Sequence, residues 1–382
     1  MDNRTDISIL LEKKDIINQC IEILRDEILY YNRYPIRDYS TYGKSFRFKY
    51  LIFELSNMFR FYFNGNNMFN PSLLLSYYYN HKSQIFQYYN FMIKGNHLSK
   101  KDLPEKIVNN LDLFLSTGLI SVEANTYKMN YRVINLFGLI LLADMYSLKK
   151  NMVWLSSDSL ATSRLFRTYV KRNQFFFSNR KKIKILDLCC GNAVIALSLN
   201  SLIPANNIQL FGLDINERAI EMAKLNCFLN RINHTKFYIK SLYDYEFNRN
   251  FDIIVSNPAY GSSSFEAKRL CHWSGETGIE QLVKIFEHIK NNLNTNGFFF
   301  VMSTSPVVNG KSLLLDHLQK YYTKVLNMTY EILETYNIST MNISSSNYKI
   351  RQKAIIYGNK NISGNGKINI ITNKYFKWLN AF

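Results

Sequence analysis

The sequence predicts an α/β protein in which a doubly wound sheet follows a mainly helical N-terminal region. From residue 183 onward, short apolar runs alternate with segments of helical periodicity. The loops after the predicted strands are short, as expected for a sheet with helices on both faces. Before residue 150 the chain has no Gly-rich loop and no cluster of catalytic residue types.

The predicted sheet is assigned element by element from these patterns. Strands are expected at residues 183–189, 208–214, 236–240, 251–257 and 297–303, and helices at 193–202, 216–230 and 279–293. The strand at 251–257 contains Phe251, Ile253, Ile254 and Val255, a short run of apolar, mostly β-branched residues that suits a strand covered on both faces.

The N-terminal half is predicted to be a separate domain, residues 1–150. Residues 9–28 have helical spacing, with Ile9, Ile16, Ile17, Cys20 and Leu24 assigned to one side. A further helix is expected to begin near Pro104 and to end at Gly118, followed by a hairpin that turns at Ala124–Asn125. A helix followed by a hairpin resembles a winged-helix module, and such modules bind nucleic acid or mediate protein contacts.

A polar, turn-rich segment at residues 147–160 marks the expected domain boundary, so residues 151–382 form the second predicted domain. It contains a basic stretch, residues 165–184, in which aromatic residues are interleaved. We interpret this stretch as a helix with a solvated basic face and a buried aromatic face. The alternative interpretation is a nucleic-acid patch.

Composition leaves the class of partner open. The chain has 382 residues, with 47 Lys and Arg against 29 Asp and Glu, a formal balance of +18. This charge suits nucleic acid, but the joint richness in Lys, Asn, Ile, Tyr and Phe also indicates a biased genome.

The five cysteines and the N-terminus point to a cytoplasmic protein. No Cys or His spacing indicates a metal site, and the cysteine usage suits a reducing cytosol. The N-terminus does not have the pattern of a signal peptide. The most apolar stretch, residues 133–146, is too short to span a bilayer and contains Asp144, so we expect no membrane association.

Two acidic residues end consecutive predicted strands. "ILDLCCGNAVIALSL" places Asp187 just before a turn with Gly191, and a helix follows, so backbone N–H groups can approach a ligand closely. A pyrophosphate would require more glycine and would be repelled by Asp187, which favours a positively charged nucleoside without phosphates. Asp214 follows about 25 residues after the first turn, where an acid accepts hydrogen bonds from ribose hydroxyls.

"FDIIVSNPAYG", residues 251–261, places Asn257 at the carboxyl end of a strand, because Pro258 stops the ladder. The Asn257 side-chain oxygen and the Pro258 carbonyl can accept the two N–H bonds of a planar nitrogen. They would stabilise positive charge that develops on that nitrogen, and Tyr260 can stack on the substrate plane.

These motifs together resemble the class I S-adenosylmethionine-dependent methyltransferases, over residues 151–310. "LDLCCGNA" is similar to the first motif of the family, "LDI" to its acidic loop, and "SNPAY" to the Asn-Pro-Pro-Tyr-type motif of enzymes that methylate nitrogen. "WLSSDS", "AIEMAKLN" and "GETGIEQLVKIFEHIKNNLNTNGFFFVM" resemble the branch of glutamine N5 and rRNA base N-methyltransferases.

The resemblance implies a Rossmann-like fold, S-adenosylmethionine as cofactor and a set of binding residues. Glycine is usual in the family where Cys189 and Ala193 stand, and Ala259 replaces the second proline. Ser241 and Leu242 occupy the place of an acid that contacts adenine in this branch. The cofactor-binding residues that it implies are Asp187, Cys189, Gly191, Asp214, Ile215, Ser241, Leu242 and Asn257, with Asn257, Pro258 and Tyr260 as catalytic residues.

We therefore predict an N-methyltransferase that acts on a planar nitrogen, in an amide, a guanidine or a similar group, of a protein side chain or a small molecule. The first alternative is an enzyme that methylates an exocyclic amine of an RNA or DNA base, flipped into the same clamp. The second is a catalytically inert nucleic-acid-binding protein with the same fold.

Overall fold

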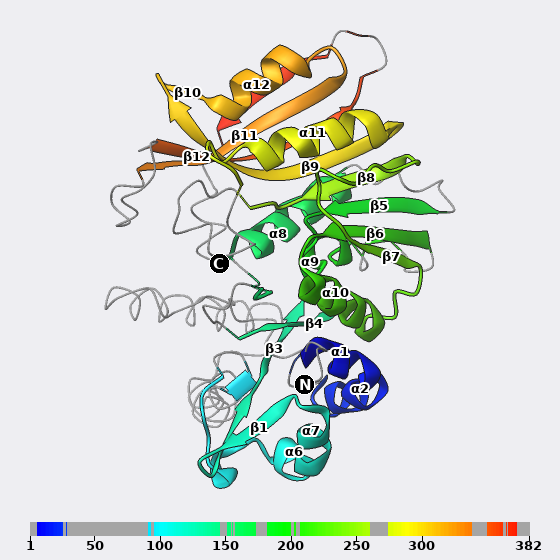
Figure 1. The fold of residues 1–382 in the computed structure, drawn as a ribbon, viewed down its shortest axis with the longest axis vertical. Helices are drawn as coiled ribbons and strands as arrows, with labels where there is room; N and C mark the ends of the chain where they lie inside the picture. Colours follow the sequence, from blue (N-terminus) through cyan, green and yellow to red (C-terminus); the bar gives the residue numbers. More distant parts are fainter. Residues whose placement is uncertain are drawn as a thin grey trace, which may run out of the picture. The chain divides into compact units, whose positions relative to one another are not determined.

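The computed structural model describes residues 6–25, 28, 91–92, 95–145, 151–153, 155, 157–172, 182–199, 202–203, 207–259, 274–337, 350–361, 364 and 366–372 (Figure 1). The chain divides into two compact units. One comprises residues 15–140, and the other comprises residues 141–380 together with residues 1–14.

The unit of residues 15–140 combines short helices with a hairpin. Its elements are α2 (Lys14–Ile23, from Asp15), the 3-10 helix η3 (Lys100–Asp102), α6 (Glu105–Val108), α7 (Leu111–Thr117), β1 (Ile120–Glu123), β2 (Thr126–Met129) and β3 (Tyr131–Leu136). The predicted hairpin is confirmed: β1 and β2 are antiparallel, with Glu123 paired to Thr126. Both turn residues, Ala124 and Asn125, have positive φ, which is the backbone of a tight two-residue hairpin turn.

The expected helix from Pro104 to Gly118 is broken into α6 and α7. Pro104 precedes α6 as its N-cap, and Gly118 ends α7 with a φ of 77°, as predicted. A break at Asn109–Asn110 separates the two helices. Asparagine competes for local backbone hydrogen bonds, and the Asn110 side chain donates to the carbonyl of Lys106.

The predicted buried stripe of residues 9–28 was partly wrong. Ile17, Cys20 and Leu24 are buried, whereas Ile9 and Ile16 are 40% and 37% exposed. Helical geometry explains the difference. Adjacent residues point about 100° apart, so Ile16 cannot share the buried face of Ile17. Ile9 lies seven residues, or about two turns, before Ile16 and therefore points to the same exposed side. The helix is also interrupted, with α1 (Asp6–Glu12) and α2 in different units.

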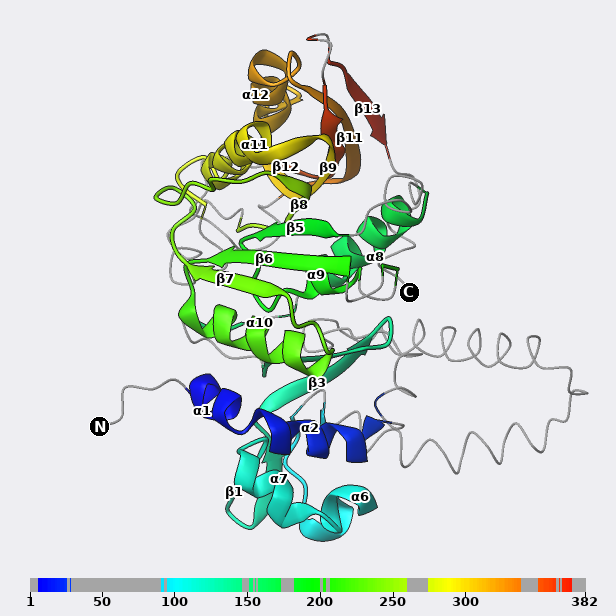
Figure 2. The same cartoon turned by 90° about the vertical axis from the view of Figure 1, so that its right-hand side faces the viewer.

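The larger unit is built on one sheet, and its predicted strands are confirmed. The strands are β5 (Ile183–Leu188), β6 (Ile208–Asp214), β7 (Thr235–Ile239), β8 (Phe251–Ser256), β9 (Leu293–Val308), β10 (Lys311–Ser312), β11 (Leu326–Asn337), β12 (Ile350–Lys360) and β13 (Ile368–Thr372). Their order is β13-β11-β12-β9-β8-β5-β6-β7, with β10 paired to β9. Figure 2 shows β7, β6, β5 and β8 side by side. Strands β5 to β9 are mutually parallel, and β12 is antiparallel to both of its neighbours.

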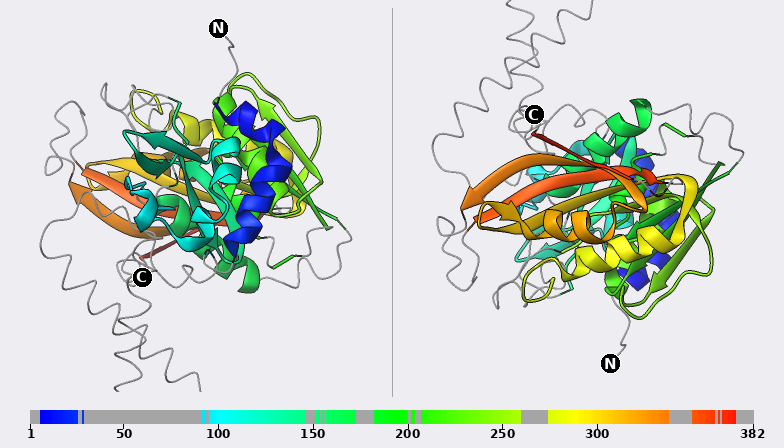
Figure 3. Two further views of the ribbon diagram at one scale, coloured as in Figure 1. Left: turned by 90° about the horizontal axis from the view of Figure 1, so that it is seen from below. Right: turned by 90° about the horizontal axis from the view of Figure 1, so that it is seen from above.

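Helices cover both faces of this sheet, which confirms the doubly wound fold. The helices are α8 (Ser157–Arg172), α9 (Val194–Leu197), α10 (Glu217–Leu229), α11 (Glu280–Asn292) and α12 (Leu313–Tyr321). Alternate residues of β9 face opposite ways. Phe299 and Val301 pack in the core cluster that contains residues of α11 and α12, whereas Phe298 and Phe300 contact Phe166 of α8. Figure 3 shows α11 and α12 along one face of the sheet.

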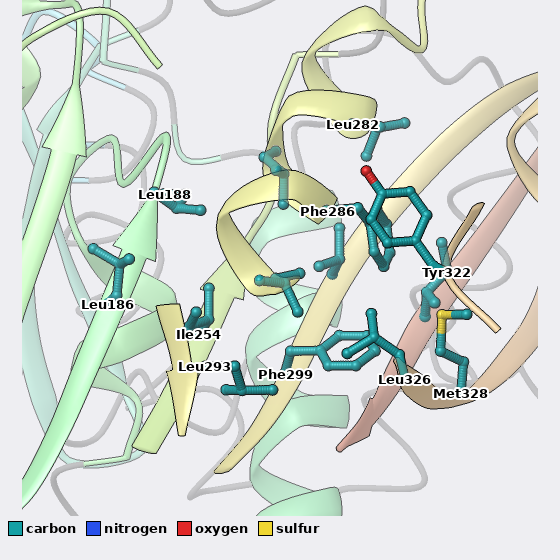
Figure 4. Packing of buried hydrophobic residues seen from close by; sticks show 14 of the residues in the cluster. Leu186, Leu188, Ile254, Leu282, Phe286, Leu293, Phe299, Tyr322, Leu326 and Met328 are labelled. Atoms are coloured by element: carbon teal, nitrogen blue, oxygen red, sulfur yellow. The ribbon is translucent and has the colours of Figure 1, made fainter. Parts of the chain in front are cut away.

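The core lies between the sheet and α11 and α12. Figure 4 shows Leu282 and Phe286 of α11 above Ile254 and Phe299 of the strands. All four side chains are fully buried, and each such side chain contributes about 1.5–3 kcal/mol relative to an exposed one. This packing fixes the strands whose carboxyl ends carry the predicted site. In the described part of the chain, no helix has the length and apolar character needed to cross a bilayer.

Candidate active site

The predicted site lies where the direction of sheet building reverses. From β5 the chain builds outward through β6 and β7, and on the other side of β5 lie β8 and β9. The loops that follow β5 and β8 therefore leave the sheet in different directions, which is where open α/β sheets bind ligands. The Ser256 hydroxyl donates to the Leu188 carbonyl at 2.6 Å and ties these two strand ends together. The residues after Leu188 and the residue Asn257 are thus brought to one place.

In the loop after β5, residues 189–193, every second residue has a left-handed backbone conformation. Cys189, Gly191 and Ala193 all have left-handed φ values, of 57°, 52° and 62°. Cys189 and Ala193 stand where the family that this sequence resembles usually has glycine. A β-carbon placed on Gly191 would meet no atom within 4 Å, so the described residues leave open space beside the loop. We call residues 189–193 the first loop.

Asp214 anchors the first loop to the end of β6. Its carboxylate accepts the Gly191 N–H at 2.8 Å and the Asn216 N–H at 2.9 Å, and the Cys190 N–H donates to the Leu213 carbonyl at 3.1 Å. Burial raises the pKa of Asp214, while these backbone donors lower it. The next residue, Ile215, is 58% exposed, which leaves an apolar side chain uncovered beside the carboxylate.

Asp187 lies beneath the first loop and is buried. One carboxylate oxygen accepts the Ala196 N–H at 3.3 Å, and the other, Oδ1, has no hydrogen-bond partner among the described residues. Burial raises its pKa well above the usual range, the Ala196 bond lowers it, and Asp214 raises it again. A cation next to Asp187 would lower this pKa, because an opposite charge favours the carboxylate.

The thiols of the first loop are not activated. Burial raises the pKa values of Cys189 and Cys190 well above their usual range, and the nearby carboxylates of Asp214 and Asp187 raise them further. A neutral thiol is a poor nucleophile, so this environment disfavours nucleophilic attack by either cysteine.

Asn257 presents its amide at the end of β8. Its Nδ2 donates to the Ser159 hydroxyl at 3.1 Å, and its Oδ1 is buried without a hydrogen-bond partner in the described part of the chain. Ser159 stands in the first turn of α8. The hydroxyl therefore orients the amide and leaves the Oδ1 lone pairs for another donor. Pro258 and Ala259 are buried, and Tyr260 lies outside the described residues.

The comparisons with known proteins agree with this geometry. The family description "methyltransferase small domain" matches residues 173–334, which include the first loop, Asp214 and Asn257. Residues 173–334 are a methyltransferase small domain.

Known relatives of this methyltransferase domain act on different acceptors. A release factor glutamine methyltransferase of Flavobacterium psychrophilum is 28% identical over 187 residues, 49% of this chain and 62% of that protein. The enzyme of the same name from Aliivibrio fischeri is 32% identical over 128 residues, 31% of this chain and 44% of that protein. A tRNA1(Val) (adenine(37)-N6)-methyltransferase of Actinobacillus pleuropneumoniae is 34% identical over 93 residues, 23% of this chain and 38% of that protein. The chain spans 44–62% of the length of the two glutamine methyltransferases.

Two further predicted residues of the methyltransferase domain follow β7. The Ser241 hydroxyl accepts the Tyr243 N–H at 3.1 Å, so it shapes its own turn. The Leu242 side chain is part of the buried core, and its carbonyl bonds the His288 ring at 2.9 Å. The Leu242 side chain therefore packs in the core at the carboxyl end of β7, and its predicted contact with adenine stays a prediction.

Sequence reasoning missed an ion pair next to the site. The carboxylate of Asp144, the only charged residue of the apolar stretch 133–146, accepts two bonds from Arg218, of 2.9 and 2.6 Å. It also accepts the Val153 N–H at 2.7 Å. Arg218 is in the first turn of α10, four residues after Asp214, so this pair fixes the chain before α8 to the acidic loop. The sequence signal for this ion pair was Asp144, a single acidic residue in an otherwise apolar stretch.

Another missed feature is the loop that leads into α11. The Glu280 carboxylate accepts the backbone N–H groups of Thr277, Gly278 and Ile279, at 2.8, 2.9 and 3.0 Å. Gly275 has a φ of 91°, which favours glycine, and a β-carbon there would lie 2.4 Å from the Glu280 Cδ atom, so the Glu280 side chain would have to move. The motif "GETGIE" is thus a folded turn built around one carboxylate.

The described half of the basic stretch supports the interpretation as a helix with a buried aromatic face. Phe166 is fully buried, and Tyr169 contacts Phe298, Phe300 and Tyr357. Arg167 donates to the Ser198 carbonyl at the end of α9, and burial lowers its pKa. The Arg167 guanidinium is therefore bound at the C-terminus of a helix. Residues 173–181 of the basic stretch lie outside the described residues.

Proposed function

We propose that this chain is an S-adenosylmethionine-dependent N-methyltransferase whose acceptor is the side-chain amide of a protein. One observation carries the proposal: the buried, unpartnered Oδ1 of Asn257 lies at the strand ends that also hold the first loop. An acceptor oxygen in that position suits a substrate N–H, and the relatives named as glutamine methyltransferases support an amide nitrogen.

The described residues fit the cofactor. The open space over Gly191 admits a ligand against the backbone, Asp214 can accept from ribose hydroxyls, and Ile215 offers an apolar contact. The orphaned Oδ1 of buried Asp187 suits a ligand with positive charge. When bound, S-adenosylmethionine supplies a methyl group on a positively charged sulfur.

The protein's own groups then act on the acceptor nitrogen. An amide nitrogen is a weak nucleophile because its lone pair is delocalised. By accepting the amide N–H bonds, Asn257 Oδ1 and the Pro258 carbonyl hold the nitrogen in place and stabilise its developing positive charge. Ser159 keeps the Asn257 amide in the required orientation. We assign Tyr260 to stacking on the plane of the acceptor.

The proposal places the enzyme in the cytoplasm. Cys20, Cys189, Cys190 and Cys227 are free thiols, which suits a reducing compartment. The acceptors named for the relatives, a release factor and a tRNA, are components of translation.

The test is turnover and cofactor affinity of Asn257→Ala, with Ser159→Ala as the matched control. We expect Asn257→Ala to bind S-adenosylmethionine as the parent does and to lose about 10²–10³ in turnover, the scale for one preorganised polar contact. Ser159→Ala removes one neutral hydrogen bond and should lose about 2- to 10-fold. Near-normal turnover by Asn257→Ala would make this turn structural and the catalytic assignment wrong.

The tRNA adenine-N6 relative favours one second candidate, an exocyclic amine of a nucleic-acid base. An adenine N6 presents the same two N–H bonds to Asn257 and Pro258. Transfer of a labelled methyl group to a cell extract, separated into protein, nucleic acid and small molecules, distinguishes the candidates. Label in nucleic acid, with a rate that falls steeply with salt, would replace the protein amide as acceptor.

A further inference from the structure

Asn226 is a fully buried amide in the last turn of α10, and it forms a hydrogen bond to the first loop. Its Oδ1 accepts the Leu142 N–H at 2.7 Å. Its Nδ2 donates to the Leu142 carbonyl at 3.1 Å and to the Asn192 carbonyl at 3.2 Å. An amide nitrogen has two N–H donors, so both are used.

These three bonds join three separate segments. The pair to Leu142 satisfies both backbone groups of one residue in β4 (Leu139–Asp144), as a neighbouring strand would. The third bond reaches the first loop at Asn192, between the left-handed residues Gly191 and Ala193. Asn226 therefore fixes the orientation of the peptide that joins Asn192 to Ala193.

The first loop needs such a restraint. Cys189 and Ala193 hold a backbone conformation that residues with a β-carbon disfavour, so the loop is held in place by its surroundings. Asp214 holds the loop from one side, through the Gly191 N–H. The Asn226 bond to the Asn192 carbonyl is one residue further along the chain.

We infer that Asn226 is a positioning residue: it holds the first loop in the shape that receives the cofactor and couples that shape to strand β4. The part that concerns the cofactor rests on the proposed function, whereas the restraint on the loop does not. Asn226 is outside the set of residues that the sequence motifs assign to the cofactor.

The test is Asn226→Asp, which keeps the size and the Oδ1 acceptor but replaces two donors with an oxygen that faces two carbonyl groups. The matched control is Asn230→Asp, at the residue that follows α10, where Nδ2 donates to the Asn226 carbonyl. Hydrogen exchange of the Gly191 and Ala193 amides, which are both hydrogen-bonded, reports the loop directly.

We expect Asn226→Asp to speed exchange of these two amides about ten-fold and to weaken S-adenosylmethionine binding about ten-fold, the loss of roughly one hydrogen bond. Asn230→Asp should alter thermal stability and leave both quantities unchanged. Where Asn226→Asp fails to fold, Asn226→Ala removes the same donors without adding charge and carries the same expectation.

Unchanged exchange in a folded Asn226 variant, or equal changes in Asn230→Asp, would overturn the inference. If the parent protein does not bind S-adenosylmethionine, the proposed function fails. The exchange comparison then still decides whether Asn226 holds the first loop.

Discussion

Gly191→Ala separates the stability of the first loop from its use in binding. The residue has a φ of 52°, and a β-carbon there meets no protein atom within 4 Å. The left-handed conformation costs an L-residue about 1–2 kcal/mol, and the loss of glycine's freedom in the unfolded chain offsets about 0.4–1 kcal/mol. The free energy of unfolding should therefore fall by about 1 kcal/mol.

Cofactor binding should fall by more than this. The new methyl group enters the space assigned to the cofactor, and the loop cannot easily withdraw. Gly191 is held by Asp214, the Cys190 N–H donates to Leu213, and the Ala193 N–H donates to Cys190 at 2.7 Å. Overpacking of this kind costs about 1–3 kcal/mol, which is about 5- to 150-fold in affinity.

The assay is calorimetric binding of S-adenosylmethionine together with chemical denaturation, and Gly310→Ala is the matched control. Gly310 lies in the turn between β9 and β10, has a φ of 78°, and also has no atom within 4 Å of an added β-carbon. It should lose similar stability and no affinity. Equal affinity of Gly191→Ala and the parent would refute the placement of the cofactor on this loop.

Three other substitutions test the site. Asp214→Ala should weaken S-adenosylmethionine binding at least about ten-fold, since each bond to a charged acceptor contributes about 1.5–3 kcal/mol; calorimetry with unchanged affinity would show that the acidic loop is misassigned. Arg218→Met should lower the free energy of unfolding by about 3–5 kcal/mol, because the buried carboxylate of Asp144 loses its only described cationic partner and keeps only neutral donors such as the Val153 N–H. Asp144→Asn in the same chain should recover part of this loss, and a further loss measured by chemical denaturation would contradict the argument. Asp187→Asn should raise the stability of the cofactor-free protein at pH 7 by on the order of 1 kcal/mol. Burial raises the pKa of Asp187 in the folded state, so ionisation of this carboxyl destabilises the folded protein. The destabilisation is fully present above the folded-state pKa and absent below the ordinary carboxyl range, near pH 4. A stability gain of Asp187→Asn that persists at low pH, or a stability loss at pH 7, would refute this cause.

The sheet could be predicted because its strands carry a local signal. Residues 208–214 were predicted and observed as a strand, and the strand predicted at 251–257 is observed at Phe251–Ser256. Both were recognisable because a strand buried on both faces is mostly apolar. The antiparallel strands β11 and β12 were not predicted. Polar residues interrupt the apolar positions of both strands, so neither strand has a clear apolar alternation. The pairing of β12 with β9 also joins residues far apart in sequence.

The positions of three candidate site residues at strand ends were predictable, but their contacts were not. Asp187, Asp214 and Asn257 stand at strand ends, and strand ends follow from periodicity. The Ser159 contact to Asn257 joins positions 98 apart, and the Asn226 contact to Leu142 joins positions 84 apart. No local pattern specifies such pairs, so these partners required the structure.

The alternating left-handed backbone of the first loop has a consequence for how tightly a ligand can bind. A loop of three glycines samples many shapes, and a ligand must select one at an entropic cost. Cys189 and Ala193 have far fewer accessible shapes, and both hold the required one against their own preference. The first loop is thus already ordered in the folded protein, so its conformational entropy is lost on folding and not on ligand binding. Association should then involve little rearrangement of the loop, and the affinity should reflect contacts rather than adaptation.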